Sequence, residues 1–222
     1  MKTVVLASAK GGSAKSTLTA HFAVAAELAG DGPAVLLDLD PQGSLAAWWN
    51  AREAETPALS PTTLAELPER LAALASAGYA VALIDTPPAM TSAIKAVVER
   101  ADLVVIPVKP SPHDLRSVGA TVEIVREAGK PFTFVVTQAK ANALLTVQAM
   151  GALSEHGRVA SVIMHDRVDY AASMVDGRTV LETNPKSPAA AETRDLWAFV
   201  QSRFNESTKD RKAEKHEESR PA

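Results

Sequence analysis

The chain has 222 residues, of which 46% are hydrophobic and 22% charged, and its formal net charge is -3 at pH 7. This composition is typical of a globular protein with a substantial core, and the charge argues against a wholly basic nucleic-acid coat protein. Because there is no cysteine, disulfides, cysteine zinc sites and thiolate-held iron–sulfur clusters are excluded. The apolar runs are too short for a signal-peptide core or a membrane span, so we expect a soluble, cytoplasmic protein that inserts in no membrane.

Short apolar runs alternate along the chain with longer segments of helical pattern. The runs are continuously apolar, which is typical of strands covered on both faces, and their alternation with helices predicts an α/β fold with a mostly parallel sheet. The expected strands are residues 4–7, 34–38, 80–85, 103–107, 132–136 and 159–163. The expected helices are residues 18–29, 64–77, 93–100, 115–128, 147–156 and 189–204.

The end of the chain differs in composition from the rest. Residues 205–222 include five basic and five acidic residues and no large apolar side chain. Such a segment cannot bury a core, so we expect a single domain over residues 1–204 followed by a disordered charged tail. The tail is either a solvated end without a role or the site of a weak accessory contact.

A glycine-rich loop joins the first expected strand to the first expected helix. From residue 9 to residue 17 it reads Ala-Lys-Gly-Gly-Ser-Ala-Lys-Ser-Thr. The backbone N–H groups of such a turn, together with the start of the following helix, form an anion site. Lys15 would reach the β- and γ-phosphates of a nucleotide, and Ser16 would place its hydroxyl on Mg²⁺. Alanines stand at residues 9 and 14, where the ordinary phosphate-loop motif has glycines.

Residues 10–17 resemble the deviant Walker A motif, K-G-G-x-G-K-[ST]-T, of the ParA/MinD superfamily of ATPases. The resemblance implies a P-loop NTPase-like fold with helices on both faces of the sheet, ATP and Mg²⁺ as cofactors, and a homodimer that encloses ATP. In that dimer Lys10 would reach the partner's phosphates. The other implied nucleotide-binding residues of the loop are Gly11, Gly12, Ser13, Ala14 and Thr17. Ala14 departs from the family's glycine, which permits a positive φ, so alanine there should cost about 1 kcal/mol.

Two aspartates follow the second expected strand in the sequence Asp38-Leu-Asp40-Pro-Gln-Gly-Ser. This segment resembles the family's switch I, D-x-D-P-Q-G. The resemblance implies that Asp40 orients the attacking water and contributes to the metal site, and that Asp38 supports the phosphate and metal network. A helix is expected to continue from Ser44, and its tryptophans, Trp48 and Trp49, fit packing better than stacking on bases.

The third expected strand ends in Asp85-Thr-Pro87-Pro, which resembles the family's Walker B and switch II segment. A carboxylate at the end of a buried strand can hold Mg²⁺ through water, and residues 86–88 would sense the γ-phosphate. The sequence contains no further obvious catalytic base. Hydrolysis should therefore depend on positioning and electrostatics and should be slow without an activator.

Gln138 ends the fifth expected strand at the point where family members place an adenine-contacting side chain, often asparagine. Its amide offers the same donor and acceptor, although a polar loop residue without a role fits the position equally well. Residues 167–180 resemble a ParA pattern, R-x-x-[YF]-x-x-[AS]-x-x-x-G-x-[ST]-V. Family members carry DNA-contacting basic residues in the stretch that follows. In this chain it holds Lys186, Arg194 and Arg203, each of which could equally be an ordinary surface charge.

Within the superfamily, the missing cysteines argue against the nitrogenase iron protein, and the charged C-terminus has no apolar face for the membrane helix of a Min-type protein. The ParA branch remains, without an N-terminal helix-turn-helix because the phosphate loop begins near residue 10. Its members bind nucleoid DNA non-specifically as ATP dimers until a ParB-like or cargo-adaptor protein stimulates hydrolysis. Plasmid or chromosome complexes are the first candidates for cargo. The alternatives are a protein cargo, such as chemotaxis clusters or carboxysomes, and a nucleotide-switched binding module with little turnover.

Overall fold

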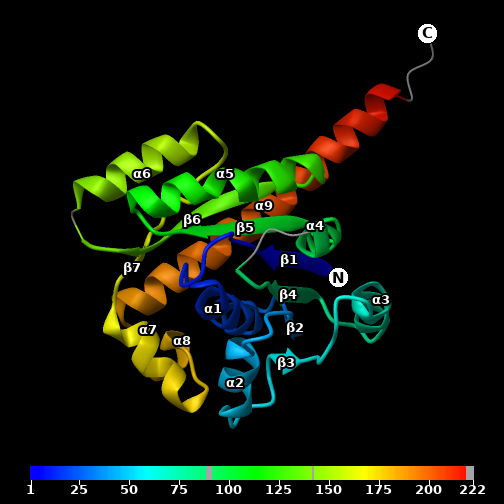
Figure 1. The fold of residues 1–222 in the computed structure, drawn as a ribbon. Helices are drawn as coiled ribbons and strands as arrows, with labels where there is room; N and C mark the ends of the chain where they lie inside the picture. The colour runs from blue at the N-terminus through cyan, green and yellow to red at the C-terminus, as the bar shows by residue number, and fades with distance from the viewer. Residues whose placement is uncertain (89–91, 142, 219–222) are drawn as a thin grey trace.

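A computed structural model describes residues 1–88, 92–141 and 143–218, and within them the strands form one parallel sheet (Figure 1). The strand order is β3-β2-β4-β1-β5-β6-β7, which confirms the predicted α/β fold. The strands are β1 (Lys2–Leu6), β2 (Ala34–Asp38), β3 (Ala58–Leu59), β4 (Val81–Asp85), β5 (Leu103–Val108), β6 (Phe132–Ala139) and β7 (Met164–His165).

Helices cover both faces of the sheet because successive strand residues point to opposite sides, and both sides are apolar. In β1, Val4 and Leu6 pack with one core cluster, and Val5 packs with the other. The first cluster includes residues of α1, α2, α8 and α9, and the second includes residues of α3, α4, α5 and α6. The helices are α1 (Lys15–Ala29), α2 (Ser44–Asn50), α3 (Leu67–Ser76), α4 (Ser92–Val98), α5 (Pro112–Glu127), α6 (Leu144–Ser154), α7 (Val168–Ser173), α8 (Val180–Thr183) and α9 (Pro188–Glu218).

The central strand, β1, lies where the chain order of the sheet reverses. It pairs with β4 on one side and β5 on the other, and the loop that follows it leads into α1. In open parallel sheets, ligands bind at the carboxyl ends of the strands beside such a reversal. The register places Leu6 opposite Asp85 and Asp85 opposite Asp38, so three strands end in one row.

The expected strand over residues 159–163 is wrong. Only an isolated bridge joins Val159 to Phe134 of β6, and regular pairing begins again where Met164 meets Thr137 in β7. Between these two points β6 advances three residues, from 134 to 137, while the other segment advances five, from 159 to 164. The extra two residues must bulge out, and a continuous ladder cannot form.

The final helix, α9, extends to Glu218 and therefore continues beyond Phe204, its predicted end. In Figure 1 its last turns extend away from the body of the protein. Residues 205–218 contain no glycine or proline and several strong helix formers, which favours continuation of the helix. Residues 219–222 of the expected tail lie outside the described residues, and the division of the chain into domain and tail stays a prediction.

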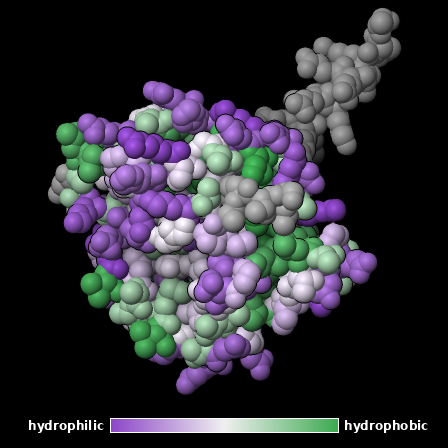
Figure 2. All heavy atoms as spheres, in the orientation of Figure 1, coloured by the Kyte–Doolittle hydropathy of each residue, from purple (hydrophilic) through white to green (hydrophobic). Residues whose placement is uncertain are grey.

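The surface in Figure 2 intersperses hydrophilic and hydrophobic side chains. None of the helices in the described part of the chain is both long and apolar enough to cross a bilayer.

Candidate nucleotide-binding site

The loop between β1 and α1 has the backbone shape that its glycines predict. Gly12 has φ +74° and Ala14 has φ +69°, so both lie in the left-handed region. Ala14 directly precedes α1, and its carbonyl accepts a hydrogen bond of 2.9 Å from the N–H of Leu18. The position where this chain departs from the family's glycine therefore does require a positive φ. The first turn of α1 contains no acidic residue, so the positive end of its dipole is available to an anion.

Side chains of β6 and α5 hold the phosphate loop in place through hydrogen bonds. Thr137 donates its hydroxyl to the carbonyl of Ser13 at 3.1 Å, and the Gln138 amide donates to the carbonyl of Gly12 at 3.2 Å. On the other side the N–H of Ala9 donates to the Thr121 hydroxyl at 3.1 Å. These threonines are more than a hundred residues from the loop in sequence, and no local pattern marks them.

Lys15 lies beneath the loop with only 6% of its surface exposed. Its ammonium donates a long hydrogen bond, 3.5 Å, to the carbonyl of Lys10. Burial lowers the pKa of this lysine, and the carboxylates of Asp85 and Asp40 oppose the shift. Within the described part of the chain this buried cation has one weak hydrogen-bond partner, which suits it to the dense negative charge of a polyphosphate.

Lys10, in contrast, is about two-fifths exposed, and its ammonium forms a 3.0 Å ion pair with Asp114. Asp114 lies in the first turn of α5. Its carboxylate also accepts a hydrogen bond from the hydroxyl of Ser111, which is the N-cap of that helix. Its backbone N–H donates back to the Ser111 hydroxyl at 3.2 Å. Asp114 was not among the residues predicted from the sequence. The signal that could have found it is the helix-start spacing Ser-Pro-His-Asp.

Asp85 is completely buried at the end of β4. One carboxylate oxygen accepts the Ser16 hydroxyl, and the other, Oδ1, has no hydrogen-bond partner among the described residues. Burial, together with the nearby carboxylates of Asp38 and Asp40, raises the pKa of Asp85 to about 7, although the Ser16 hydroxyl and the Lys15 ammonium oppose the shift. An unpartnered buried carboxylate oxygen beside a serine hydroxyl fits Mg²⁺, which would supply the missing charge.

The described residues contain no group of three or more histidine, aspartate or glutamate side chains placed to hold a metal ion. A Mg²⁺ ion at Ser16 and Asp85 would therefore take its remaining ligands from phosphate oxygens and water, which Mg²⁺ commonly retains. Asp40, the third expected metal residue, lies close enough to act on the pKa of both Lys15 and Asp85.

In the switch I segment the two aspartates make different contacts. The oxygens of Asp38 accept the N–H groups of Asp40 and Ala46, at 3.0 and 2.9 Å. Asp38 therefore holds the switch segment and the first turn of α2 in place. Asp40 accepts the N–H of Gln42 at 3.0 Å and is half-buried at the edge of the site.

The segment after β4 runs beside the phosphate loop. The Thr86 hydroxyl donates to the carbonyl of Leu6 at 2.8 Å, which ties β4 to β1. Pro87 is half-buried, and a Cβ atom added to Gly11 would lie 3.7 Å from Pro88. The proposed γ-phosphate sensor thus lies next to the loop, although residues 89–91, which continue it, lie outside the described residues.

A small pocket of about 140 Å³ opens beside the loop at Ala14, Thr17 and Gln138. Asp166 and Tyr170 line its other side. Gln138 adopts φ +51°, which turns its side chain out of the β6 ladder toward the loop. The contact of Gln138 with a nucleotide base stays a prediction. A larger hollow of about 720 Å³ lies between α1 and α9, and its lining includes no residue of the phosphate loop.

The three basic residues expected to contact DNA do not form one cluster on the surface. Lys186 is exposed in the turn before α9, and Arg194 donates from α9 to the carbonyl of Pro185 at 2.9 Å, so these two lie at one place. Arg203 is nine residues further along α9, about 13 Å away at the rise of a helix, and is half-buried.

Comparison with known proteins agrees with this geometry. The model of the CobQ/CobB/MinD/ParA nucleotide-binding domain matches residues 4–60. The chain is 33% identical to maintenance of carboxysome distribution protein A of Gloeobacter kilaueensis, over 86% of this chain and 89% of that protein. It is 29% identical to the chromosome-partitioning ATPase Soj of Thermus thermophilus, over 93% and 98% of the two chains.

A solved structure of the ATP complex of Cyanothece McdA shares the fold, with a TM-score of 0.73 and 20% identity over 94% of this chain and 96% of that one. The relatives, the phosphate loop at β1 and the carboxylates at the ends of β2 and β4 all lead to one assignment: the chain belongs to the ParA/MinD superfamily of P-loop ATPases.

Proposed function

We propose that this protein is a slow ATPase that forms a homodimer around ATP, binds double-stranded DNA without regard to sequence, and positions a cargo. A ParB-like or cargo-adaptor protein would stimulate hydrolysis and thereby release the ATPase from DNA. The protein would act in the cytoplasm, in association with the nucleoid. The observation that carries the proposal is that Lys15, Ser16, Asp85 and Asp40 converge at one edge of the sheet, with Lys10 at its rim. Phosphoryl transfer requires this set of charges and hydroxyls.

Each of these groups has a role that its position supports. Lys15 would hold the phosphates, and Ser16 and Asp85 would hold Mg²⁺, whose charge would offset that of the phosphates. Asp40 would orient the attacking water from a switch segment that Asp38 keeps in place. Because catalysis would depend on positioning and electrostatics, turnover should stay slow until a partner completes the site.

The cargo has two candidates. A plasmid or chromosome complex agrees with the likeness to Soj, the chromosome-partitioning ATPase. A protein assembly is the second candidate, favoured by the 33% identity to a carboxysome distribution protein over 89% of its length. Measuring the ATPase rate with a centromere-binding protein and with a carboxysome adaptor would distinguish them, because only the true partner should accelerate hydrolysis.

Lys10→Ala should leave ATP binding largely intact and abolish the ATP-dependent dimer. The reason is that Lys10 is exposed at the rim of the site, whereas Lys15 is the buried cation that would hold the bound phosphates. Sedimentation with a slowly hydrolysed ATP analogue measures the dimer. Lys130→Ala is the matched control, since Lys130 precedes β6 at the opposite edge of the sheet. A Lys10→Ala protein that dimerises like the wild type would rule out this role.

DNA binding tests the whole proposal. It should require ATP, ignore sequence and weaken steeply with salt, because it would depend on phosphate contacts and counterion release. Lys186→Glu and Arg194→Glu should each lower affinity about tenfold or more for all sequences alike, since the dimer doubles every lost contact. Arg203→Glu should have a smaller effect, because Arg203 is half-buried and distant from the other two.

Fluorescence anisotropy with labelled duplexes at low and moderate salt measures this binding. Arg70→Glu on α3 provides the charge-matched control, and sedimentation verifies that each variant still dimerises. Dimers that show no retention on DNA at low salt would contradict the proposed DNA binding and leave an ATP switch that uses another surface.

A further inference from the structure

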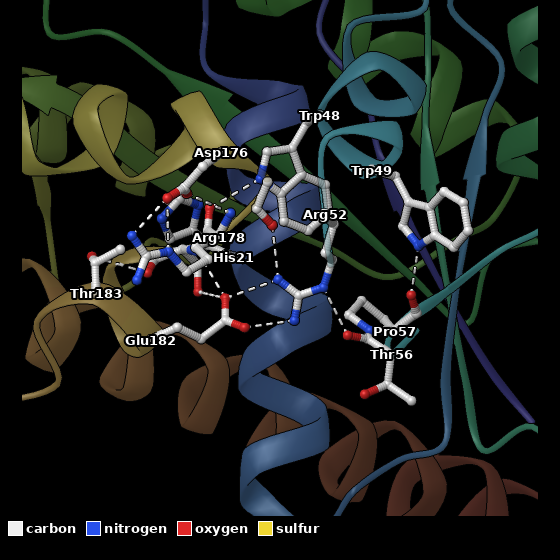
Figure 3. Close-up of polar contacts among 12 residues, drawn as sticks. His21, Trp48, Trp49, Arg52, Thr56, Pro57, Asp176, Arg178, Glu182 and Thr183 are labelled. Carbon is white, nitrogen blue, oxygen red and sulfur yellow. Dashed lines mark hydrogen bonds and ion pairs between the residues drawn. The ribbon is translucent and has the colours of Figure 1, made fainter. Parts of the chain in front are cut away.

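The short helix α2 connects two parts of the molecule. Its first turn follows switch I, where Asp38 accepts the N–H of Ala46 at 2.9 Å and the N–H of Gly43 donates to the carbonyl of Asp40 at 2.9 Å. Its last turn, about 10 Å away at the rise of a helix, ends against the segment that contains η1 (Met174–Asp176) and α8. The contacts at this second end are drawn in Figure 3.

Arg52, two residues beyond α2, is at the centre of these contacts, with only 4% of its side chain exposed. Its guanidinium donates to both oxygens of Glu182, at 3.0 and 2.6 Å, to the carbonyl of Gly177 at 2.8 Å and to the carbonyl of Thr56 at 2.8 Å. It also lies over the ring of Trp48, 5.5 Å from the centroid. We call Arg52, Trp48, Gly177 and Glu182 the Arg52 cluster.

The backbone in this cluster is in close contact as well. A Cβ atom added to Gly177 would fall 2.6 Å from the carbonyl carbon of Ala51 and closer still to Arg52. The Trp48 indole donates to the carbonyl of Arg178 at 3.0 Å. The end of α2 and the segment around Gly177 therefore fit together without space for an added side chain.

The cluster is also joined to the helix that carries the phosphate loop. Glu182 completes a capping box at the start of α8, where it accepts the N–H of Thr179 at 2.8 Å. The next N–H, that of Val180, donates to Nε2 of His21 at 3.3 Å, and the opposite ring nitrogen of His21 lies 2.8 Å from the carbonyl of Thr17. Burial lowers the pKa of His21 to about 4, so the ring is neutral and can accept at Nε2 while it donates at Nδ1.

We propose that Arg52 is a positioning residue, which fixes α2 on Gly177 and Glu182 and thereby holds the switch I aspartates in place relative to α8. The inference rests on the proposed function, because the aspartate that it positions is the proposed water-orienting residue. It adds a physical connection between the two ends of the proposed cycle. The turn that carries Lys186 directly follows α8, so the Arg52 cluster connects switch I to the segment that leads to that surface.

The test compares Arg52→Met with Arg178→Met. Arg178 is a matched control because it lies in the same region, but its guanidinium is half-exposed and pairs with Asp176 on its own loop. Hydrogen exchange measured by mass spectrometry reports the two attached segments, residues 44–50 and residues 180–183. Steady-state kinetics reports kcat and KM for ATP.

Arg52→Met should speed exchange about tenfold in both segments together and lower kcat by a similar factor, while KM for ATP changes less than about twofold. Arg178→Met should change neither. Arg52→Lys keeps the charge but loses the forked contact with Glu182, so its exchange rates and kcat should lie between those of wild type and Arg52→Met. Glu182→Gln, which retains an acceptor for Thr179, should reproduce part of the effect and tests the pairing if Arg52→Met fails to fold.

The inference is overturned if Arg52→Met and Glu182→Gln both turn over ATP at the wild-type rate, or if exchange rises in one segment and not in the other. A wild-type protein that neither hydrolyses ATP nor dimerises with it would instead refute the proposed function. The two failures are thus distinguishable, because the second appears before any variant is made.

Discussion

Gly177→Ala should destabilise the protein by about 3–5 kcal/mol, among the largest effects of any single methyl group in this chain. Two costs add at this position. Gly177 has φ +76°, where an alanine costs about 1 kcal/mol. The new Cβ atom would also overlap backbone atoms of Ala51 and Arg52, which cannot move as the end of a flexible side chain could. Relief would require α2 to separate from the segment around Gly177.

Urea unfolding of wild type and variant measures this free energy. Gly129→Ala provides the control, because Gly129 has φ +63° but no heavy atom within 4 Å of an added Cβ. That variant should lose only about 1 kcal/mol, the cost of the backbone conformation alone. Equal losses at the two glycines would mean that the contact between α2 and Gly177 contributes nothing to stability.

Asp85→Asn should change how stability depends on pH. The pKa of Asp85 is about 7 in the folded protein, compared with an ordinary value of 3.8. The folded state therefore binds this proton more tightly than the unfolded state, and the free energy of unfolding falls as pH rises from about 4 to 7. Asparagine has no such proton, so the variant should gain stability relative to wild type across this window, on the order of 3 kcal/mol.

Urea unfolding at about pH 4.5, 6 and 8, without nucleotide or Mg²⁺, measures the difference in the free energy of unfolding between Asp85→Asn and wild type across this window. Asp195→Asn, an exposed position on α9, controls for the general effect of removing a negative charge. A difference between Asp85→Asn and wild type that stays constant with pH would show that Asp85 ionises normally.

The same variant should hydrolyse ATP at least about a hundredfold more slowly, because the carboxylate expected to hold Mg²⁺ is gone.

Much of the site follows from short-range chemistry, and the sequence is sufficient for it. The phosphate loop was predictable because its signal is local: glycines that permit positive φ, one lysine at each end and a helix start within nine residues. The ends of β2 and β4 were predictable because a buried parallel strand is a continuous apolar run, and the carboxylates of Asp38 and Asp85 follow directly. That Trp48 and Trp49 pack within the protein was also the favoured interpretation, and each indole does donate to a backbone carbonyl.

Other elements were missed because they are short or depend on distant partners. Residues 159–163 have the composition of a strand, but the register of β6 prevents a ladder there. The helix α8 has only four residues, so no periodicity can indicate it. The role of Asp38 in the phosphate and metal network stays a prediction, but its contacts with the backbone N–H groups of Asp40 and Ala46 have no signal in the sequence.

By itself, therefore, the sequence determined the fold class and the residues of the phosphate loop, since backbone torsion preferences and strand burial are properties of consecutive residues. The tertiary structure alone decided which groups those residues meet. Asp114 pairs with Lys10 across 104 positions of sequence, and Glu182 pairs with Arg52 across 130. Such pairs have no local signature, because each exists only where the folded chain brings two opposite charges from distant segments within hydrogen-bond distance.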